Sequence, residues 1–230
     1  MIDFFNFSSV KRELKGVARK GHADVLRWYA PGVTKAIGVR NPEMRVVSRQ
    51  LIEFNKTNPK ALALLVKIWN TEIFEFRWIA QDAIRGLEMK EAIEFIEKTK
   101  SGVNNWMHSD NLLCAIGKHS KENPEVIMKL AERYSKSKQP WTRRLGVIFP
   151  IHVVKKYPRY LDRTLKILDR NMKDDHDYVR KGVSWTCANC YLINIGKTRR
   201  WLKNWEGKRG VEKTVNACYS RIRAYEKRRE

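Results

Sequence analysis

The stretch that decides the fold is Ala61-Leu62-Ala63-Leu64-Leu65-Val66-Lys67-Ile68-Trp69. Its apolar side chains recur three, four and seven residues apart, which is the spacing of one face of an α-helix. Residues 92–96 and 126–130 repeat this spacing, and no alternating pattern flanked by hairpin dipeptides occurs. The sequence therefore predicts an all-α protein with about a dozen helices.

Prolines indicate that these helices repeat. Pro59, Pro124 and Pro158 follow Asn, Asn and Tyr, and each is expected at the first position of a helix. Their separations are 124 − 59 = 65 and 158 − 124 = 34 residues. Because 65 is nearly twice 34, a further repeat is expected near residue 90, and a last one near residue 198.

Each of these first helices is followed by a second helical segment, expected to begin near residues 73, 105, 140 and 176. Two helices every 33 to 38 residues are typical of HEAT-like and TPR-like repeat proteins. The TPR consensus residues do not align, so we expect a HEAT-like α-α superhelical solenoid with a concave basic groove. No long linker divides the chain, and residues 1–230 are expected to form a single domain.

The chain is strongly basic, with 47 Lys and Arg against 25 Asp and Glu, a formal charge of +22. Such a charge predicts an anionic partner, either nucleic acid, an anionic membrane or an acidic protein. No run of about 18 apolar residues is present, so we expect no membrane span. Residues 1–5 do not begin a secretion signal, which favours a cytoplasmic protein.

The four cysteines are few for this length, which suits a reducing compartment. Cys187 and Cys190 form a C-x-x-C pair, but no two further ligands lie nearby, so we expect no metal site. A thioredoxin-like redox motif would need a βαβ context. Both cysteines are therefore expected in the core of a helix.

Aligning the second helices of the repeats places cationic residues in one column. Arg77, Arg144 and Lys181 share the column, and Arg143 and Arg180 lie one step earlier. Cations in register along one face would form a basic stripe that neutralises the phosphates of a duplex. For any one of these residues taken alone, an ordinary solvated surface charge is the favoured interpretation.

Asp110 is the only acidic residue in this column, and Trp106 lies one helical turn before it. A carboxylate repels phosphate, so its presence there suggests catalysis, in which it would stabilise an oxocarbenium sugar or orient a water. The alternative is an ion pair with Arg144 or a helix cap within residues 104–110. The spacing alone favours this alternative.

Most tryptophans at helical spacing pack in cores, but some near basic grooves stack on sugars or bases. Trp141 and Trp185 also lie on second helices. Trp106 and Trp185 are the better stacking candidates because they lie closest to the basic column.

Several segments resemble the AlkD-like DNA alkylation-repair glycosylases, which are HEAT-like repeat proteins. The resemblance runs through most of the chain. The segments that carry it are Arg27-Trp28-Tyr29, Gly38-Val39-Arg40-Asn41-Pro42-Glu43-Met44-Arg45, Phe74-Glu75-Phe76-Arg77-Trp78-Ile79-Ala80, Trp106-x-x-x-Asp110, Trp141-x-x-Arg144 and Lys181-Gly182-Val183-Ser184-Trp185.

The resemblance implies a monofunctional DNA glycosylase of base excision repair that removes positively charged N3- and N7-alkylated purines from duplex DNA. It implies that Asp110 is the catalytic carboxylate and that Trp106 and Trp185 are aromatic walls against the deoxyribose. Arg144 would contact the DNA backbone, and Tyr29 would lie near the cleft. We also expect Arg77, Arg143 and Lys181 to contact DNA.

Because an alkylated cationic base is already a good leaving group, no cofactor and no metal are expected. The protein is expected to act as a monomer in association with the nucleoid.

The chain departs from the family pattern at two places. Met107 and His108 follow Trp106, where the family usually has an acidic residue, and Thr186-Cys187 follow Trp185 instead of a Leu-Arg pair. His108 is interpreted as a cleft residue or, more often for a lone histidine, as a surface or capping residue.

Two other functions remain open on the sequence. The first is a non-catalytic HEAT-repeat protein that recognises branched or distorted DNA, and the second is a scaffold for an acidic protein. The stretch from Gly196 to Glu230, with 12 basic and 4 acidic residues, would extend a DNA contact or form a solvated terminal helix.

Overall fold

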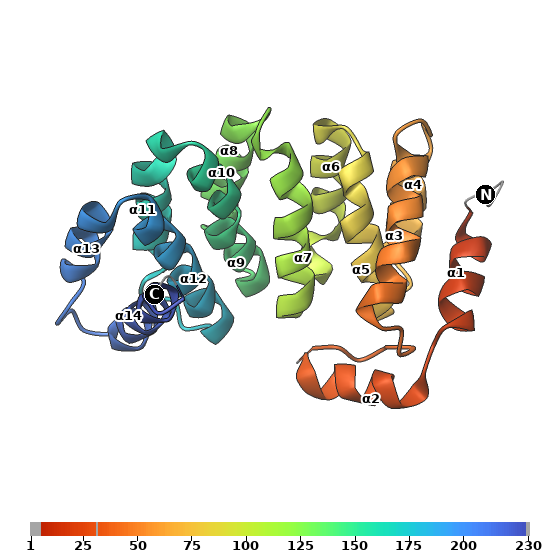
Figure 1. The fold of residues 1–230 in the computed structure, drawn as a ribbon, viewed down its shortest axis with the longest axis horizontal. Coiled ribbons are helices and arrows are strands. Elements are labelled where there is room, and N and C mark those ends of the chain that lie inside the picture. Colours follow the sequence, from red (N-terminus) through yellow and green to blue (C-terminus); the bar gives the residue numbers. More distant parts are fainter. Residues whose placement is uncertain (1–5, 31, 229–230) are drawn as a thin grey trace. The chain divides into compact units, whose positions relative to one another are not determined.

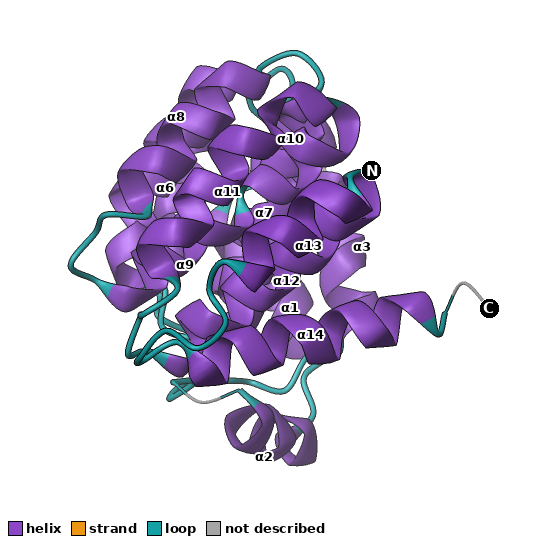
Figure 2. Cartoon of the chain, turned by 90° about the vertical axis from the view of Figure 1, so that its left-hand side faces the viewer, coloured by secondary structure: helices purple, strands orange, loops and turns teal. Residues whose placement is uncertain are grey.

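The structure, a computed structural model, describes residues 6–30 and 32–228. Residues 1–5, which entered the expectation about a secretion signal, lie outside the described residues. The described part is all-α, with fourteen α-helices, four short 3₁₀ helices and no strand (Figure 2). Among these residues, no helix is long and apolar enough to cross a membrane.

The chain divides into two compact units, Met1–Lys118 and His119–Glu230. The expectation of one domain over residues 1–230 stays a prediction. Figure 1 shows the helices of both units coloured along the chain.

The first unit contains seven α-helices in two layers. One layer is formed by α3, α5 and α7, which pack in that order, and α4 and α6 pack together in the other layer. Figure 1 shows α2 lying crosswise to α3, α5 and α7. The bounds of the helices are α1 Phe7–Gly16, α2 Lys20–Tyr29, α3 Asn41–Asn55, α4 Ala61–Trp69, α5 Phe74–Ala83, α6 Met89–Thr99 and α7 Trp106–Gly117, with 3₁₀ helices η1 Ile84–Gly86 and η2 Lys100–Gly102.

The second unit continues the pattern of paired helices. Helix α9 packs against α8 and α12, and α12 also packs against α11 and α14. The bounds are α8 Pro124–Tyr134, α9 Pro140–Ile148, α10 Pro150–Lys156, α11 Leu161–Asn171, α12 Asp177–Ile193, α13 Ile195–Lys203 and α14 Glu212–Glu226, with η3 Lys118–Ser120 at the junction and η4 Pro158–Tyr160 before α11.

The expected repeat is confirmed at its helix starts. The second helices were expected near residues 73, 105, 140 and 176, and α5, α7, α9 and α12 begin at Phe74, Trp106, Pro140 and Asp177. The first helices near residues 90 and 124 are α6 and α8. The sequence therefore located these six helix starts to within one residue, whereas the helices expected at residue 158 and near residue 198 begin three residues away, α11 at Leu161 and α13 at Ile195.

Two of the three proline expectations were wrong in detail. Pro124 is the first residue of α8, as predicted, but Pro59 lies in a turn two residues before α4 begins. Pro158 opens the 3₁₀ helix η4, and α11 follows from Leu161. Proline fixes φ at a value that suits both kinds of helix start as well as turns, so its position alone does not distinguish them.

The segment that decides the fold lies in the core, as its pattern requires. On α4, Ala61, Leu65 and Ile68 are fully buried and Trp69 is nearly so. Full burial of a Leu or Ile side chain stabilises a fold by about 1.5–3 kcal/mol. This face of α4 therefore holds it against its neighbours α5 and α6.

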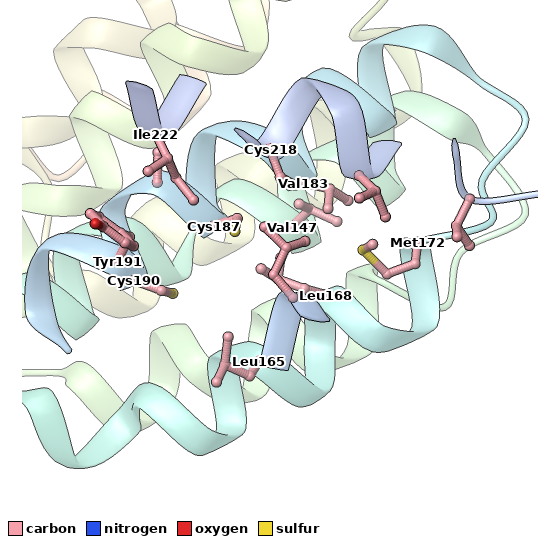
Figure 3. Close-up of a cluster of buried hydrophobic side chains, with 14 of the residues drawn as sticks. Val147, Leu165, Leu168, Met172, Val183, Cys187, Cys190, Tyr191, Cys218 and Ile222 are labelled. Atoms are coloured by element: carbon pink, nitrogen blue, oxygen red, sulfur yellow. The ribbon is translucent and has the colours of Figure 1, made fainter. Parts of the chain in front are cut away.

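The two cysteines of the C-x-x-C pair are buried in the core of the second unit. Cys187 and Cys190 are both inaccessible to solvent on α12, and Cys218 of α14 lies with them among Val183 and other apolar side chains (Figure 3). Burial raises the pKa of the Cys190 thiol, and a hydrogen bond with Cys218 raises that of Cys187. The prediction of helix-core cysteines is confirmed.

The segment between α2 and α3 is fixed by one buried carboxylate. Glu75 on α5 is fully buried and accepts hydrogen bonds from the amides of Ile37, Gly38 and Val39. Gly38 has φ +88°, and a Cβ there would lie 1.9 Å from the Arg19 carbonyl oxygen, so only glycine fits. Glu75 thereby anchors residues 37–39, in the segment that connects α2 to α3.

Candidate functional site

The first turn of α7 holds Trp106 and Asp110 on one face of the helix. The Asn105 side chain caps this helix by accepting a hydrogen bond from the His108 amide at 2.9 Å. The Ser109 hydroxyl lies 2.9 Å from the Trp106 carbonyl oxygen and 3.3 Å from Asp110 Oδ1. The cap expected within residues 104–110 is thus made by Asn105, and the partly exposed Asp110 carboxylate lies one turn from the indole.

Tyr29 of α2 is brought against this turn. Its ring meets the Trp106 indole edge-on, with centroids 5.3 Å apart and planes at 76°. Just before α7, the Asn104 side-chain amide donates to the Gly32 carbonyl at 2.6 Å, which joins the end of α2 to the start of α7. The structure therefore places Tyr29 beside Trp106, two residues that the sequence separates by 77 positions.

His108 is a buried packing residue, so its interpretation as a surface side chain was wrong. The imidazole is 2% exposed and stacks on the Phe74 ring at 4.8 Å and 15°. Its Nε2 lies 3.2 Å from the Phe74 carbonyl oxygen, and its Nδ1 lies 3.0 Å from the Asn105 side-chain nitrogen. Burial lowers the pKa of His108 to about 3, so the ring is neutral at physiological pH.

Arg77 is half-buried, and its guanidinium is directed at main-chain carbonyls. Its Nε donates to the Trp69 carbonyl at 3.2 Å and its Nη1 to that of Gly102 at 3.3 Å. The guanidinium also lies 4.6 Å from the centre of the Trp69 ring. Burial lowers the pKa of Arg77. In this position the residue joins α5 to the end of α4 and to the end of η2.

The first unit contains a basic cleft that the column of second-helix residues did not predict. The cleft has a volume of about 740 Å³ and lies between α3, α5 and α7. Arg45 and Arg49 of α3 and Arg85 of η1 line it, with Asp82 as its only carboxylate. Asp82 is already engaged, because it pairs with Arg85 at 2.9 Å and accepts from the Ser48 hydroxyl. The cleft therefore carries a net positive charge.

A sequence signal for this cleft existed. Arg45 and Arg49 are four residues apart, so they share one face of α3, and Met44 and Leu51 on the other face are fully buried. The column of cationic residues comprises only second helices, from residue 73 onward, and α3 lies before them.

In the second unit, Arg143 and Arg144 are occupied by partners within the protein. Arg143 forms a two-point ion pair with Asp174, at 2.6 Å for Nε and 3.0 Å for Nη2, and this bonding raises the pKa of Arg143. Arg144 is 4% exposed, and its Nη1 donates to the Tyr178 carbonyl at 2.6 Å. Both guanidinium groups join α9 to the start of α12.

Lys181 and Trp185 lie one turn apart on α12. The Lys181 ammonium is half-exposed, 2.7 Å from Asp177 Oδ2 and 4.6 Å from the centre of the Tyr178 ring. Trp185 is partly exposed. Between them, a Cβ on Gly182 would lie 3.4 Å from Arg144 Nη1, so α12 approaches α9 closely at this turn. Trp141 packs on Tyr178 at 5.0 Å.

Among the residues that the structure describes, no three His, Cys, Asp or Glu side chains gather where they would hold a metal ion. The chemistry available at the start of α7 is that of one carboxylate beside two aromatic rings. This set suits stabilisation of a developing cation.

The sequence of residues 10–222 matches the family described as DNA alkylation repair enzyme. The chain belongs to this family. Comparison with curated proteins gave no match.

Solved structures of similar fold include proteins of this DNA alkylation repair family. A protein described as a predicted DNA alkylation repair enzyme from Enterococcus faecalis superposes with a TM-score of 0.73 at 15% identity, over 86% of this chain and 94% of that one. AlkD2 from Streptococcus mutans gives 0.65 at 18% identity, over 86% and 96%. The smu.31 protein of Streptococcus mutans UA159 gives 0.63 at 18% identity, over 77% and 92%. At these identities the likeness confirms the AlkD-type helical-repeat fold.

Proposed function

We propose that this member of the DNA alkylation repair family is a monofunctional DNA N-glycosylase of base excision repair. Its substrates would be positively charged N3- and N7-alkylated purines in duplex DNA, removed without a cofactor or a metal. The observation that carries the proposal is the Asp110 carboxylate on the same helix face as Trp106, which in turn contacts Tyr29. The protein is proposed to act as a monomer on nucleoid DNA in the cytoplasm.

The reaction needs few groups. The bond between C1′ and the purine nitrogen breaks, and its electron pair leaves with the cationic base, which becomes neutral. Positive charge then develops at C1′ and O4′ of the sugar, and a water adds at C1′ and loses a proton. Asp110 would stabilise this charge electrostatically, and Trp106 and Trp185 would contribute their π-faces.

The proposed DNA contacts divide into two kinds by their geometry. Tyr29 and Lys181 have exposed side chains that are suited to direct contact. Arg77, Arg143 and Arg144 donate to main-chain carbonyls, so we propose that they act mainly through their charge, which attracts the phosphate backbone.

The test is release of 7-methylguanine from methylated duplex DNA, measured by chromatography. Asp110→Asn should reduce the release rate on the order of 10²–10³-fold, as expected when one electrostatic contact to the transition state is removed. Asp162→Asn is the matched control, because it removes one negative charge at an exposed ion pair with Lys197 on the second unit. We expect this control to keep the wild-type rate.

Two results would refute parts of the proposal. Full activity in Asp110→Asn would refute the assignment of Asp110. Failure of the wild type to release any alkylated base would refute the proposal that the protein is a glycosylase. In that case the alternative, a non-catalytic protein that recognises branched or distorted DNA, predicts salt-sensitive binding that Asp110→Asn leaves at least as tight.

A further inference from the structure

Trp28 is the most exposed large apolar side chain among the described residues, at 83% of its surface. Val25 and Tyr29 on the same helix are each 54% exposed, and their spacing of three and four residues places all three on one face of α2. We call these three residues the exposed α2 stripe. The opposite face, with Ala23 and Leu26, is buried. Helix α2 therefore packs with its small apolar face and leaves its aromatic face in solvent.

The stripe is held in place at its C-terminal end. Tyr29 contacts Trp106 edge-on, and the Asn104 side chain donates to the Gly32 carbonyl just after α2. The following connection is bonded to the buried carboxylate of Glu75. Because α2 is already ordered, Trp28 can bind a partner without the entropic cost of ordering a flexible segment.

The surroundings of the stripe are strongly basic. Residues 11–29 contain six cations and two acidic residues, a net charge of 6 − 2 = +4. The six are exposed, and they are Lys11, Arg12, Lys15, Arg19, Lys20 and Arg27. Exposed aromatic rings among cations are the pattern by which proteins hold nucleic acids, since the rings stack on bases and the cations neutralise phosphates.

We propose that Trp28 stacks on a base of damaged duplex DNA, next to the site formed by Tyr29, Trp106 and Asp110. In an intact duplex both faces of each base are already covered by neighbours. A ring from the protein reaches a base face only where the stack is opened, which costs least at a damaged nucleotide. Trp28 would therefore strengthen binding to damaged DNA more than binding to intact DNA. The inference rests on the DNA binding of the proposed function and not on excision.

The experiment measures binding to two duplexes of one sequence, one intact and one with a tetrahydrofuran abasic analogue. The analogue has no base to release, so excision plays no part. Trp28→Ala should weaken binding to the abasic duplex by about 5- to 100-fold, the range for one lost base stack, and change binding to the intact duplex much less. The melting temperature of the Trp28→Ala protein should stay at the wild-type value, because the Trp28 side chain is exposed.

The salt dependence separates stacking from charge. In Trp28→Ala the slope of log affinity against log salt should equal that of the wild type, whereas Lys20→Ala should lower it by about one. A 2-aminopurine placed beside the abasic analogue should change its fluorescence on binding wild type and lose that change with Trp28→Ala. Val126→Ala, an exposed valine of the second unit, is the control and should behave as wild type.

Trp28→Phe keeps a stacking ring and should retain most of the affinity. If Trp28→Ala binds the abasic duplex as tightly as wild type, or if Trp28→Phe is as weak as Trp28→Ala, the stacking role is refuted. The first of these results is also what a docking surface for another protein would give. If the wild type itself binds neither duplex, the proposed function fails together with this inference.

Discussion

Lowering the pH from 7 to 5 should destabilise the first unit through His108. The ring is neutral in the fold, and its two nitrogens have fixed roles. The Asn105 side-chain oxygen accepts from the His108 amide, so the Asn105 nitrogen faces Nδ1, which must accept. Nε2 then carries the proton and donates to the Phe74 carbonyl. A second proton on Nδ1 would face the Asn105 amide group, in a site that is almost inaccessible to solvent.

The magnitude follows from the two pKa values. In the unfolded chain the pKa of His108 is at its ordinary value of 6.5, and in the fold it is lowered to about 3. Between these values only the unfolded state binds the proton, so stability is fully present above pH 6.5 and is lost as pH falls toward 3. From pH 7 to pH 5 the loss is about 2 kcal/mol, at 1.36 kcal/mol for each pKa unit.

The assay is urea unfolding of the wild type and of His108→Gln at both pH values. Glutamine keeps a donor and an acceptor but does not titrate. Between pH 7 and pH 5, the unfolding free energy of His108→Gln should fall by about 2 kcal/mol less than that of the wild type. The contributions of all other titrating groups cancel when the two proteins are compared. Equal losses in the two proteins would show that His108 is not a buried neutral histidine.

Two other predictions test the first unit. The double variant Arg45→Ala, Arg49→Ala should weaken duplex binding and lower the slope of log affinity against log salt by about two, because each residue is expected to neutralise one phosphate. An unchanged slope in binding titrations would exclude the cleft between α3, α5 and α7 from the DNA contact. Glu75→Ala should reduce the unfolding free energy by about 3 kcal/mol or more, because it leaves buried amides without an acceptor, and Glu75→Gln should lose less. Hydrogen exchange at residues 37–39 checks this, and unchanged protection in Glu75→Ala would refute the anchoring role.

The repeat was predictable from the sequence because it is encoded locally. Apolar spacing within one helix, as on α4, and the recurrence of helix starts need no knowledge of the partner helix. Helix α10 was missed because it is short and follows α9 with only Phe149 between them, so the two appear as one segment in the sequence. Pro150 is its first residue, and a proline at that position marks a helix start as readily as an interruption.

Side-chain direction was not predictable by the same means. Alignment of the repeats shows which residues occupy equivalent positions, but not whether a long side chain extends into solvent or folds back on the backbone. Arg77 and Arg144 both fold back, each to a carbonyl of a neighbouring segment. The contact between Tyr29 and Trp106 was equally invisible, because it depends on a connection that Glu75 anchors through backbone amides.

The direction of the Arg77 and Arg144 side chains also bears on the role of Asp110. In the sequence, Asp110 was conspicuous as one carboxylate in a column of cations directed at phosphate. Two members of that column, Arg77 and Arg144, instead bond main-chain carbonyls, so an acidic residue at this register does not by itself oppose DNA binding. Asp110 lies one turn from the Trp106 indole on the same helix, and the Tyr29 ring contacts that indole. A carboxylate near two aromatic rings is a set of groups that would stabilise a cationic sugar, which is the role that we propose for Asp110.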